Sequence, residues 1–305
     1  MTIGERSFLQ AELVMLERLI SRIPEANVID RMSLEARKKE VETSLSTLKL
    51  PYYEPARARL TFRGKPTVKS HGIFAKFAAN AIDKFAIMVA AIGASQTIEL
   101  GSRGIIPNIE EYQLMITGTT MGSFGFEIEE APKDEQKLLT EFSPVKAALD
   151  KANLIMELSA GSSDDDLAEA IADENPRAIE AIRAFLEVME NNDASFALEL
   201  DGKSHQFIDV EQIKRIRERL TPENIHEGDR EILGKFQGIL PTRRTFEFMI
   251  KENNEVIIGK VGPEIEDPSK INRIIEKPTK ILVHTKQVGT SRPRYTLNDY
   301  EEIHE

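Results

Sequence analysis

Near the N-terminus, apolar residues recur every three or four positions, which is the spacing of a helix that buries one face. The first such run covers residues 6–22, and residues 23–30 interrupt it. A second run covers residues 34–48, and Ser33 stands directly before it as a candidate N-cap. The pattern therefore predicts a helical hairpin at the start of the chain.

The next segment changes from a period of two to a helical period. Residues 56–62 alternate apolar and polar side chains, which predicts a half-buried strand. Residues 73–94 set Lys, Asn and Asp side chains opposite an apolar stripe that begins at Phe74. This segment indicates an amphipathic helix, because its charges interrupt it too often for a membrane span.

A glycine-bearing stretch, "ITGTTMGSFGFEIEE", lies between two strand patterns, residues 111–117 and 123–130. A phosphate loop of the Walker type needs a Lys and a Ser or Thr after its last glycine, and then a helix. Here Gly122 is followed by Ser and Phe and then by a strand pattern, so the stretch predicts a hairpin connection. Residues 52–130 together indicate one small α/β unit.

The middle of the chain carries helix signals in quick succession. The start signals are Ser143-Pro144, the serines before Asp164, Asp165 and Asp166, Asn175-Pro176, and Asp209 with Gln212 in a capping box. Gly161 ends the first of these helices. Asp201-Gly202 between two strand-like runs predicts a type I′ hairpin.

The last 70 or so residues indicate strands again. Five strand patterns, "GKFQGIL", "RTFEFMIK", "EVIIGKV", "KILVHTK" and "RPRYTL", surround one helix, "PSKINRIIEK", between the third and the fourth. This order predicts a small closed β-barrel of OB-like or SH3-like type. The fold class is therefore α+β in three parts: a helical hairpin with an α/β unit (1–134), an acidic helical region with a β-hairpin (135–232), and the barrel (233–305).

Charge and composition narrow the function classes. The chain has 305 residues, 30% of them charged, and no cysteine, which excludes disulfides and thiolate chemistry. Its net charge is −11, and residues 135–234 hold 23 acidic against 11 basic side chains, a net of −12. We expect this acidic segment to dock on basic faces within the chain or to recruit a basic partner. A cytoplasmic location is the expectation.

Local catalytic and metal motifs are absent from the sequence. The five histidines have neither the spacing nor the cysteine partners of a zinc site. The aspartates 164–166 suit the first turn of a helix, where acidic side chains favour the dipole. The "DGK" at 201–203 resembles part of a nuclease motif, but it falls on the predicted hairpin tip. No catalytic, cofactor-binding or metal-binding residue is predicted.

Two of the predicted strands carry basic residues on one face, and nucleic acid is therefore an alternative ligand. The candidate phosphate contacts are Arg57, Arg59, Arg63, Lys65, Arg292 and Arg294. The nearby aromatics Phe246 and Phe248 alternate with Glu247, so they are expected to fill the barrel core and not to stack on bases.

The runs "LTFRGKPTVKSHGI" to "ITGTTMGSFGFEIEE" and "FQGILPTRRTFEF" to "RPRYTL" resemble uncharacterised bacterial proteins that pair an N-terminal α/β domain ending in a "GSF" strand with a C-terminal small β-barrel. The resemblance covers residues 55–130 and 233–300. Some relatives lie among mobile or defence-associated genes, so the resemblance implies a place in antiviral defence. Its motifs are structural, and they imply no functional residue.

The sequence thus favours a non-enzymatic interaction protein, a subunit or adaptor of a bacterial multi-protein system that needs no cofactor. One alternative is a nucleic-acid-binding protein that uses the two basic strand faces. A second alternative is an enzyme whose site is assembled from distant residues. Protein partners and self-association are expected, and membrane association is not.

Overall fold

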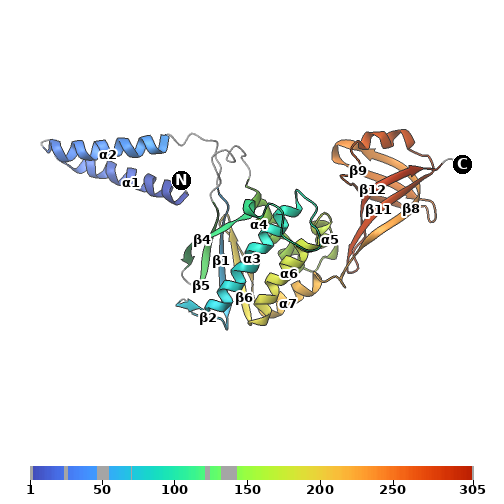
Figure 1. The fold of residues 1–305 in the computed structure, drawn as a ribbon, viewed down its shortest axis with the longest axis horizontal. Helices are drawn as coiled ribbons and strands as arrows, with labels where there is room; N and C mark the ends of the chain where they lie inside the picture. The colour runs from blue at the N-terminus through green and yellow to red at the C-terminus, as the bar shows by residue number, and fades with distance from the viewer. Residues whose placement is uncertain are drawn as a thin grey trace.

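The computed structural model describes residues 3–23, 27–46, 55–69, 71–120, 124–131 and 143–303. It is a mixed α+β structure with a helical hairpin at one end, an α/β body in the centre and a β-barrel at the other end (Figure 1). The connection at residues 121–123, where the sequence predicts the glycine-rich turn, lies outside the described residues.

The predicted helical hairpin is present as α1 (Ile3–Arg22) and α2 (Val28–Ser46). Two ion pairs, Glu12–Arg37 at 2.8 Å and Glu17–Lys38 at 3.1 Å, join the helices along their length. The cap assigned to Ser33 is wrong, because α2 begins five residues earlier and Ser33 lies inside it. Residues 28–32, directly before Ser33, contain neither Gly nor Pro to stop a helix, and Asp30 in the first turn of α2 favours the helix dipole.

The body is built on one antiparallel sheet in the order β4-β5-β1-β6-β7. Its strands are β1 (Arg57–Gly64), β4 (Leu114–Thr120), β5 (Phe124–Glu130), β6 (Ala194–Leu200) and β7 (Lys203–Phe207). A small pair, β2 (Thr67–Val68) and β3 (Gly72–Ile73), follows β1. Because β6 and β7 complete the sheet begun by β1, the boundary expected at 134/135 does not separate two cores.

Helices cover one face of this sheet and leave the other open. The layer contains α3 (Ala75–Ser95), η1 (Ile109–Tyr112), α4 (Pro144–Ala160), α5 (Asp164–Ile171), α6 (Pro176–Asn191) and α7 (Val210–Arg219). α3 is long and apolar enough to cross a membrane, yet 61% of its apolar window is buried inside the body. Phe74, expected in its apolar stripe, is 59% exposed because it is the N-cap residue outside the helix.

The predicted start signals of the body helices are confirmed by their hydrogen bonds. The side chains of Ser143, Ser163, Asn175 and Asp209 each accept a bond from a backbone N–H in the first turn of the helix they precede. Asp201 and Gly202 both have positive φ, 49° and 76°, as a type I′ hairpin turn requires. The three aspartates at 164–166 form the first turn of α5.

The C-terminal strands form a closed barrel in which β9 pairs with β10 to complete the ring. The strands are β8 (Ile225–Leu240), β9 (Thr245–Ile250), β10 (Val256–Val261), β11 (Thr279–Val288) and β12 (Arg294–Glu302). η3 (Pro241–Arg243) follows β8, and the predicted helix after β10 is a 3₁₀ helix, η4 (Pro268–Ile274). Phe246 and Phe248 fill the barrel core, as expected.

A two-stranded ribbon carries the barrel on the body. β8 starts at Ile225, and its first half pairs with β11 from Ile225–Val288 to Gly234–Thr279. Val288, at the body end of the ribbon, belongs to the hydrophobic core of the body. The barrel therefore begins inside a continuous strand, and the boundary expected at residue 232/233 cuts through β8 (Figure 1).

Candidate functional site

The acidic helix α5 contacts the barrel at the loop before β12. Asp165 Oδ1 accepts a hydrogen bond from the backbone N–H of Arg292 at 3.1 Å, and Arg294 Nη2 donates to the carbonyl of Asp165 at 3.1 Å. Arg294 also lies 3.4 Å from a carboxylate oxygen of Glu169, and Lys260 pairs with Asp173. The acidic middle thus docks within the chain, one of the two outcomes that the charge distribution predicts.

Arg219, in the last turn of α7, secures this contact from the body side. Its guanidinium donates to the carbonyls of Leu158, Ser159, Gly161 and Ser163 and to Asp164 Oδ1, the last at 2.6 Å. One side chain therefore joins the end of α4 to the start of α5. The hydrogen bond from Arg219 lowers the pKa of Asp164 below its ordinary value, and bonds from Thr290 in the barrel loop add to the effect.

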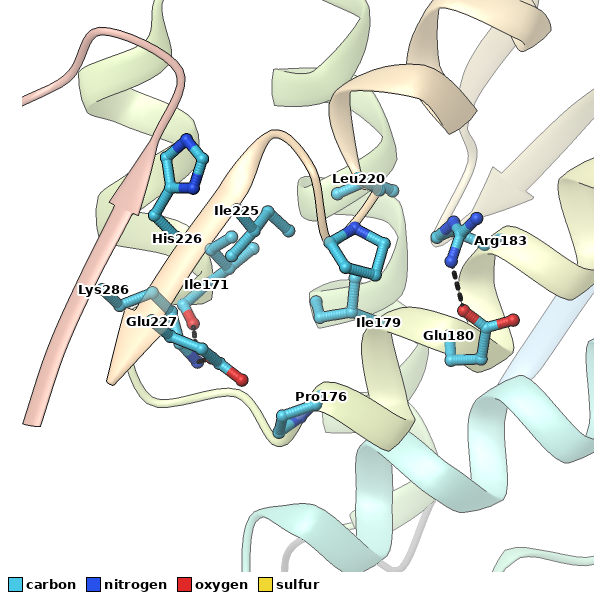
Figure 2. Close-up of a pocket in the computed structure, with 11 residues that line it drawn as sticks. Ile171, Pro176, Ile179, Glu180, Arg183, Leu220, Ile225, His226, Glu227 and Lys286 are labelled. Carbon is cyan, nitrogen blue, oxygen red and sulfur yellow. Dashed lines mark hydrogen bonds and ion pairs between the residues drawn. The ribbon is translucent and has the colours of Figure 1, made fainter. Parts of the chain in front are cut away.

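A cavity of about 390 Å³ lies where the ribbon meets the body (Figure 2). Its walls are mostly apolar and include Ile171, Ile179 and Ile225. Lys286 lines it but is only 5% exposed, and its Nζ lies 2.7 Å from the Glu174 carbonyl, 3.3 Å from the Ile171 carbonyl and 3.3 Å from Glu227 Oε2.

Three acceptors occupy the three protons of the Lys286 ammonium group. Lys286 therefore fastens the ribbon to the end of α5, and the cavity beside it belongs to the structural joint.

A larger cavity of about 670 Å³ lies on the other side of α5, and we call it the junction groove. It is lined by the end of α5, by β10, and by the loop and first residues of β12, with Glu169, Ala172, Asp173, Val256, Ile258, Lys260, Arg292, Pro293, Arg294 and Tyr295 among its residues. Val256 is 49% exposed and Ile258 is 65% exposed. The groove thus combines an exposed apolar strand with a charged rim.

The six residues predicted to contact phosphates fall into two separate groups. On β1, Arg57 pairs with Glu129 at 3.2 Å, and Arg59 lies between Glu127 and Glu199 at 3.3 and 3.1 Å. Arg63 lines a polar hollow of about 380 Å³ on the same open sheet face.

Lys65 follows β1 and forms an ion pair with Asp193. Arg292 and Arg294 lie in the junction groove of the barrel, where Arg294 is paired with α5. The candidates thus do not form one continuous basic surface, and carboxylates face most of them.

Metal-ligating side chains do not gather at one point in the described part of the chain. No three His, Asp or Glu side chains there are placed to hold a metal ion. His284 of β11 pairs with Asp229 of β8 at 2.8 Å, and His205 of β7 pairs with Glu157 of α4 at 3.4 Å. Neither pair lines one of the cavities described above.

Sequence reasoning missed the junction groove, although β10 carries a signal for it. Its core-facing residues are Ile257 and Val261, yet Val256 and Ile258 on the opposite face are apolar too. A strand with one solvated face normally alternates apolar and polar residues. Apolar side chains on both faces indicate a strand with a second surface to cover.

Comparison with protein-family models, with curated proteins and with solved structures gives no match for this chain.

Proposed function

We propose that this protein is a non-enzymatic interaction protein, an adaptor subunit that presents a barrel surface to a protein partner at a fixed position on its body. The observation that carries the proposal is the junction groove, where Val256 and Ile258 are exposed inside a cavity of about 670 Å³. Exposed apolar surface with a rim of polar residues marks protein interaction sites and ligand-binding grooves. The resemblance to bacterial proteins near defence-associated genes is the reason to place the adaptor in a bacterial multi-protein system.

We further propose that the barrel is of OB type. Its ring runs β8-β9-β10-β12-β11, so the third and fifth strands are neighbours, and they are parallel. A helix between the third and fourth strands, η4, completes the connectivity that distinguishes an OB barrel from an SH3-like meander. OB barrels bind ligands on the second and third strands and on the loops after the first and fourth. The junction groove contains the third strand and the loop after the fourth.

Charge favours a protein partner over nucleic acid. A nucleic acid gains affinity by replacing its counterions with Lys and Arg side chains. In the junction groove Arg294 is already paired with Asp165 and Glu169 of α5, and Lys260 with Asp173, which follows α5. The net charge of −11 adds a long-range repulsion of phosphates.

Affinity purification of the tagged full-length chain from its native host, with mass spectrometry of the co-eluting proteins, tests the adaptor function. We expect a defined set of proteins in stoichiometric amounts, and we expect the complex to form again from purified components. Recovery of the chain alone at native expression levels, or bound only to nucleic acid, would overturn the proposal.

A further inference from the structure

We propose that the junction groove binds an extended peptide segment of the partner by strand addition to β10, and that this segment carries an acidic side chain for Arg292. The inference rests on the proposed adaptor function and names the site and the chemistry of the partner. Strand addition uses main-chain hydrogen bonds for affinity and alternate side chains for specificity.

The free edge of β10 has a structural cause. β10 pairs with β9 from Val256 to Lys260, but with β12 only at Lys260–Thr296 and Val261–Leu297. Continuing that parallel register would set Arg294 opposite Ile258 and Arg292 opposite Val256. Within the described residues, these positions are not paired.

The α5 helix holds the start of β12 away from β10. The Arg292 N–H bonds to Asp165, and the Arg294 guanidinium bonds to the Asp165 carbonyl. Between them, Pro293 has no N–H to offer a neighbouring strand. The junction groove therefore lies where the β10–β12 pairing stops, and residues 256–258 keep one edge for another strand.

The exposed side chains of β10 indicate what the added strand would cover. Adjacent strands lie about 4.8 Å apart, and side chains at the same level point to the same side of a sheet. A strand inserted beside β10 would place its alternate side chains next to Val256 and Ile258. These are 49% and 65% exposed, so apolar or β-branched partners would remove them from water.

The charges in the groove indicate which charge the peptide should carry next to Arg292. Lys260 is neutralised by Asp173, and Arg294 by Asp165 and Glu169. Glu255, the third acidic residue of the lining with Glu169 and Asp173, accepts a hydrogen bond from Asn253 at 3.0 Å. The guanidinium of Arg292 forms no ion pair within the described part of the chain, and the residue is exposed. An acidic side chain at the level of Val256 would lie beside Arg292, whereas a basic one would be repelled.

The test uses the full-length chain and two labelled, capped hexapeptides that alternate threonine with valine. They differ at one outward position, which is glutamate in one peptide and lysine in the other. Fluorescence anisotropy should show that the glutamate peptide binds at least tenfold more tightly. Ile258→Asp should abolish this binding, while Leu233→Asp should leave it unchanged, because Leu233 is a comparably exposed residue (47%) on another strand of the barrel.

A charge exchange at Arg292 distinguishes the acidic contact from nonspecific hydrophobic binding of the peptides. Arg292→Glu should reverse the preference, so that the lysine peptide binds more tightly, while Arg215→Glu, at an exposed arginine on α7 of the body, should not. Equal binding of both peptides, no binding by the wild-type chain, or full binding by Ile258→Asp would overturn the inference. Competition by a single-stranded oligonucleotide that depends on Ile258 would overturn it in favour of a nucleic acid ligand. If the complex recovered from the native host persists with the Ile258→Asp variant, the proposed adaptor function is retained, but the junction groove is not the site that binds the partner.

Discussion

The open sheet face of the body and the junction groove of the barrel both carry arginines two positions apart along the chain. On the body, Arg57 and Arg59 face Glu129, Glu127 and Glu199 on the neighbouring strands. At the groove, Arg294 is paired with α5, while Arg292 forms no ion pair within the described residues. One surface is a closed ladder of charges, and the other keeps a cation and two apolar side chains in the open.

The two surfaces differ in the carboxylates that segments far away in the sequence bring to the arginines. Arg59 is 68 residues from Glu127 and 140 residues from Glu199, and the sheet brings all three together. At the groove, α5 forms hydrogen bonds with Arg292 and Arg294, which lie about 130 residues further along the chain. An arginine pattern on one strand therefore does not indicate whether its charges are available to a ligand.

The largest expected change in the free energy of unfolding comes from removing the Arg219 side chain, which joins the end of α4 to the start of α5. Arg219→Ala removes hydrogen bonds to four carbonyls and the ion pair to Asp164. Because these acceptors are partly buried, we expect a loss of about 3 kcal/mol in the free energy of unfolding. Urea denaturation followed by circular dichroism measures it.

Arg215→Ala is the matched control, since Arg215 lies on the same helix, is exposed and has no ion pair within the described residues. It should change the free energy of unfolding by no more than about 0.5 kcal/mol. If the two substitutions change the free energy of unfolding equally, the bonds of Arg219 to α4 and α5 are not what holds the body and the barrel together.

Much of the fold could be predicted from the sequence because its signals are local. The caps at Ser143, Asn175 and Asp209 and the turn at Asp201-Gly202 each act within a few residues. The apolar residues on both faces of β10 indicate a second surface to cover, but the place of the groove could not be predicted. It depends on where β12 stops pairing with β10 and on how Asp165 holds Arg292. These contacts join segments far apart in the chain, and a single strand pattern carries no sign of them.

A second prediction uses pH to weaken the α5 contact. The pKa of Asp164 lies below its ordinary value near 3.8 because Arg219 and Thr290 bond to its ionised form. The stability that Asp164 contributes is therefore fully present above about pH 4 and is lost as the pH falls through the lowered pKa of the folded state. We expect Asp164→Asn to cost about 1–2 kcal/mol at neutral pH and to reduce the loss of stability in acid.

Chemical denaturation of both proteins at a series of pH values from neutral into acid measures this effect. Parallel curves for wild type and Asp164→Asn over the whole series would contradict it. Asp166→Asn serves as the control, because Asp166 lies in the same first turn of α5. It should leave the acid dependence close to that of the wild type.

The charge ladder on the body provides a third, smaller effect. Arg59→Glu would bring three carboxylates together on neighbouring strands, where like charges repel. The side chains are 34–46% exposed, so water and salt screen the repulsion, and we expect a loss of about 1 kcal/mol. The loss should shrink as salt rises, and an unchanged loss at high salt would assign it to packing.

A fourth prediction concerns how the groove stays open. Asp165→Ala removes the acceptor that holds the Arg292 N–H, so the start of β12 should move toward β10. Hydrogen exchange of residues 256–259 should then slow, because more of their amides would be paired. Faster exchange in this segment would mean that Asp165 orders β10 itself and does not keep it open.

The smallest effect is expected for nucleic acid, and it tests the comparison most directly. Because carboxylates face most of the cations on both surfaces, single-stranded and duplex oligonucleotides should not bind at physiological salt. Replacing Arg57 and Arg59, or Arg292 and Arg294, by Glu should then change nothing that anisotropy can detect. Binding that weakens steeply with salt would show that phosphates displace the carboxylates. If only the barrel double substitution abolishes such binding, the binding belongs to Arg292, which has no ion pair within the described residues. If only the body double substitution abolishes it, the charge ladder opens to ligands.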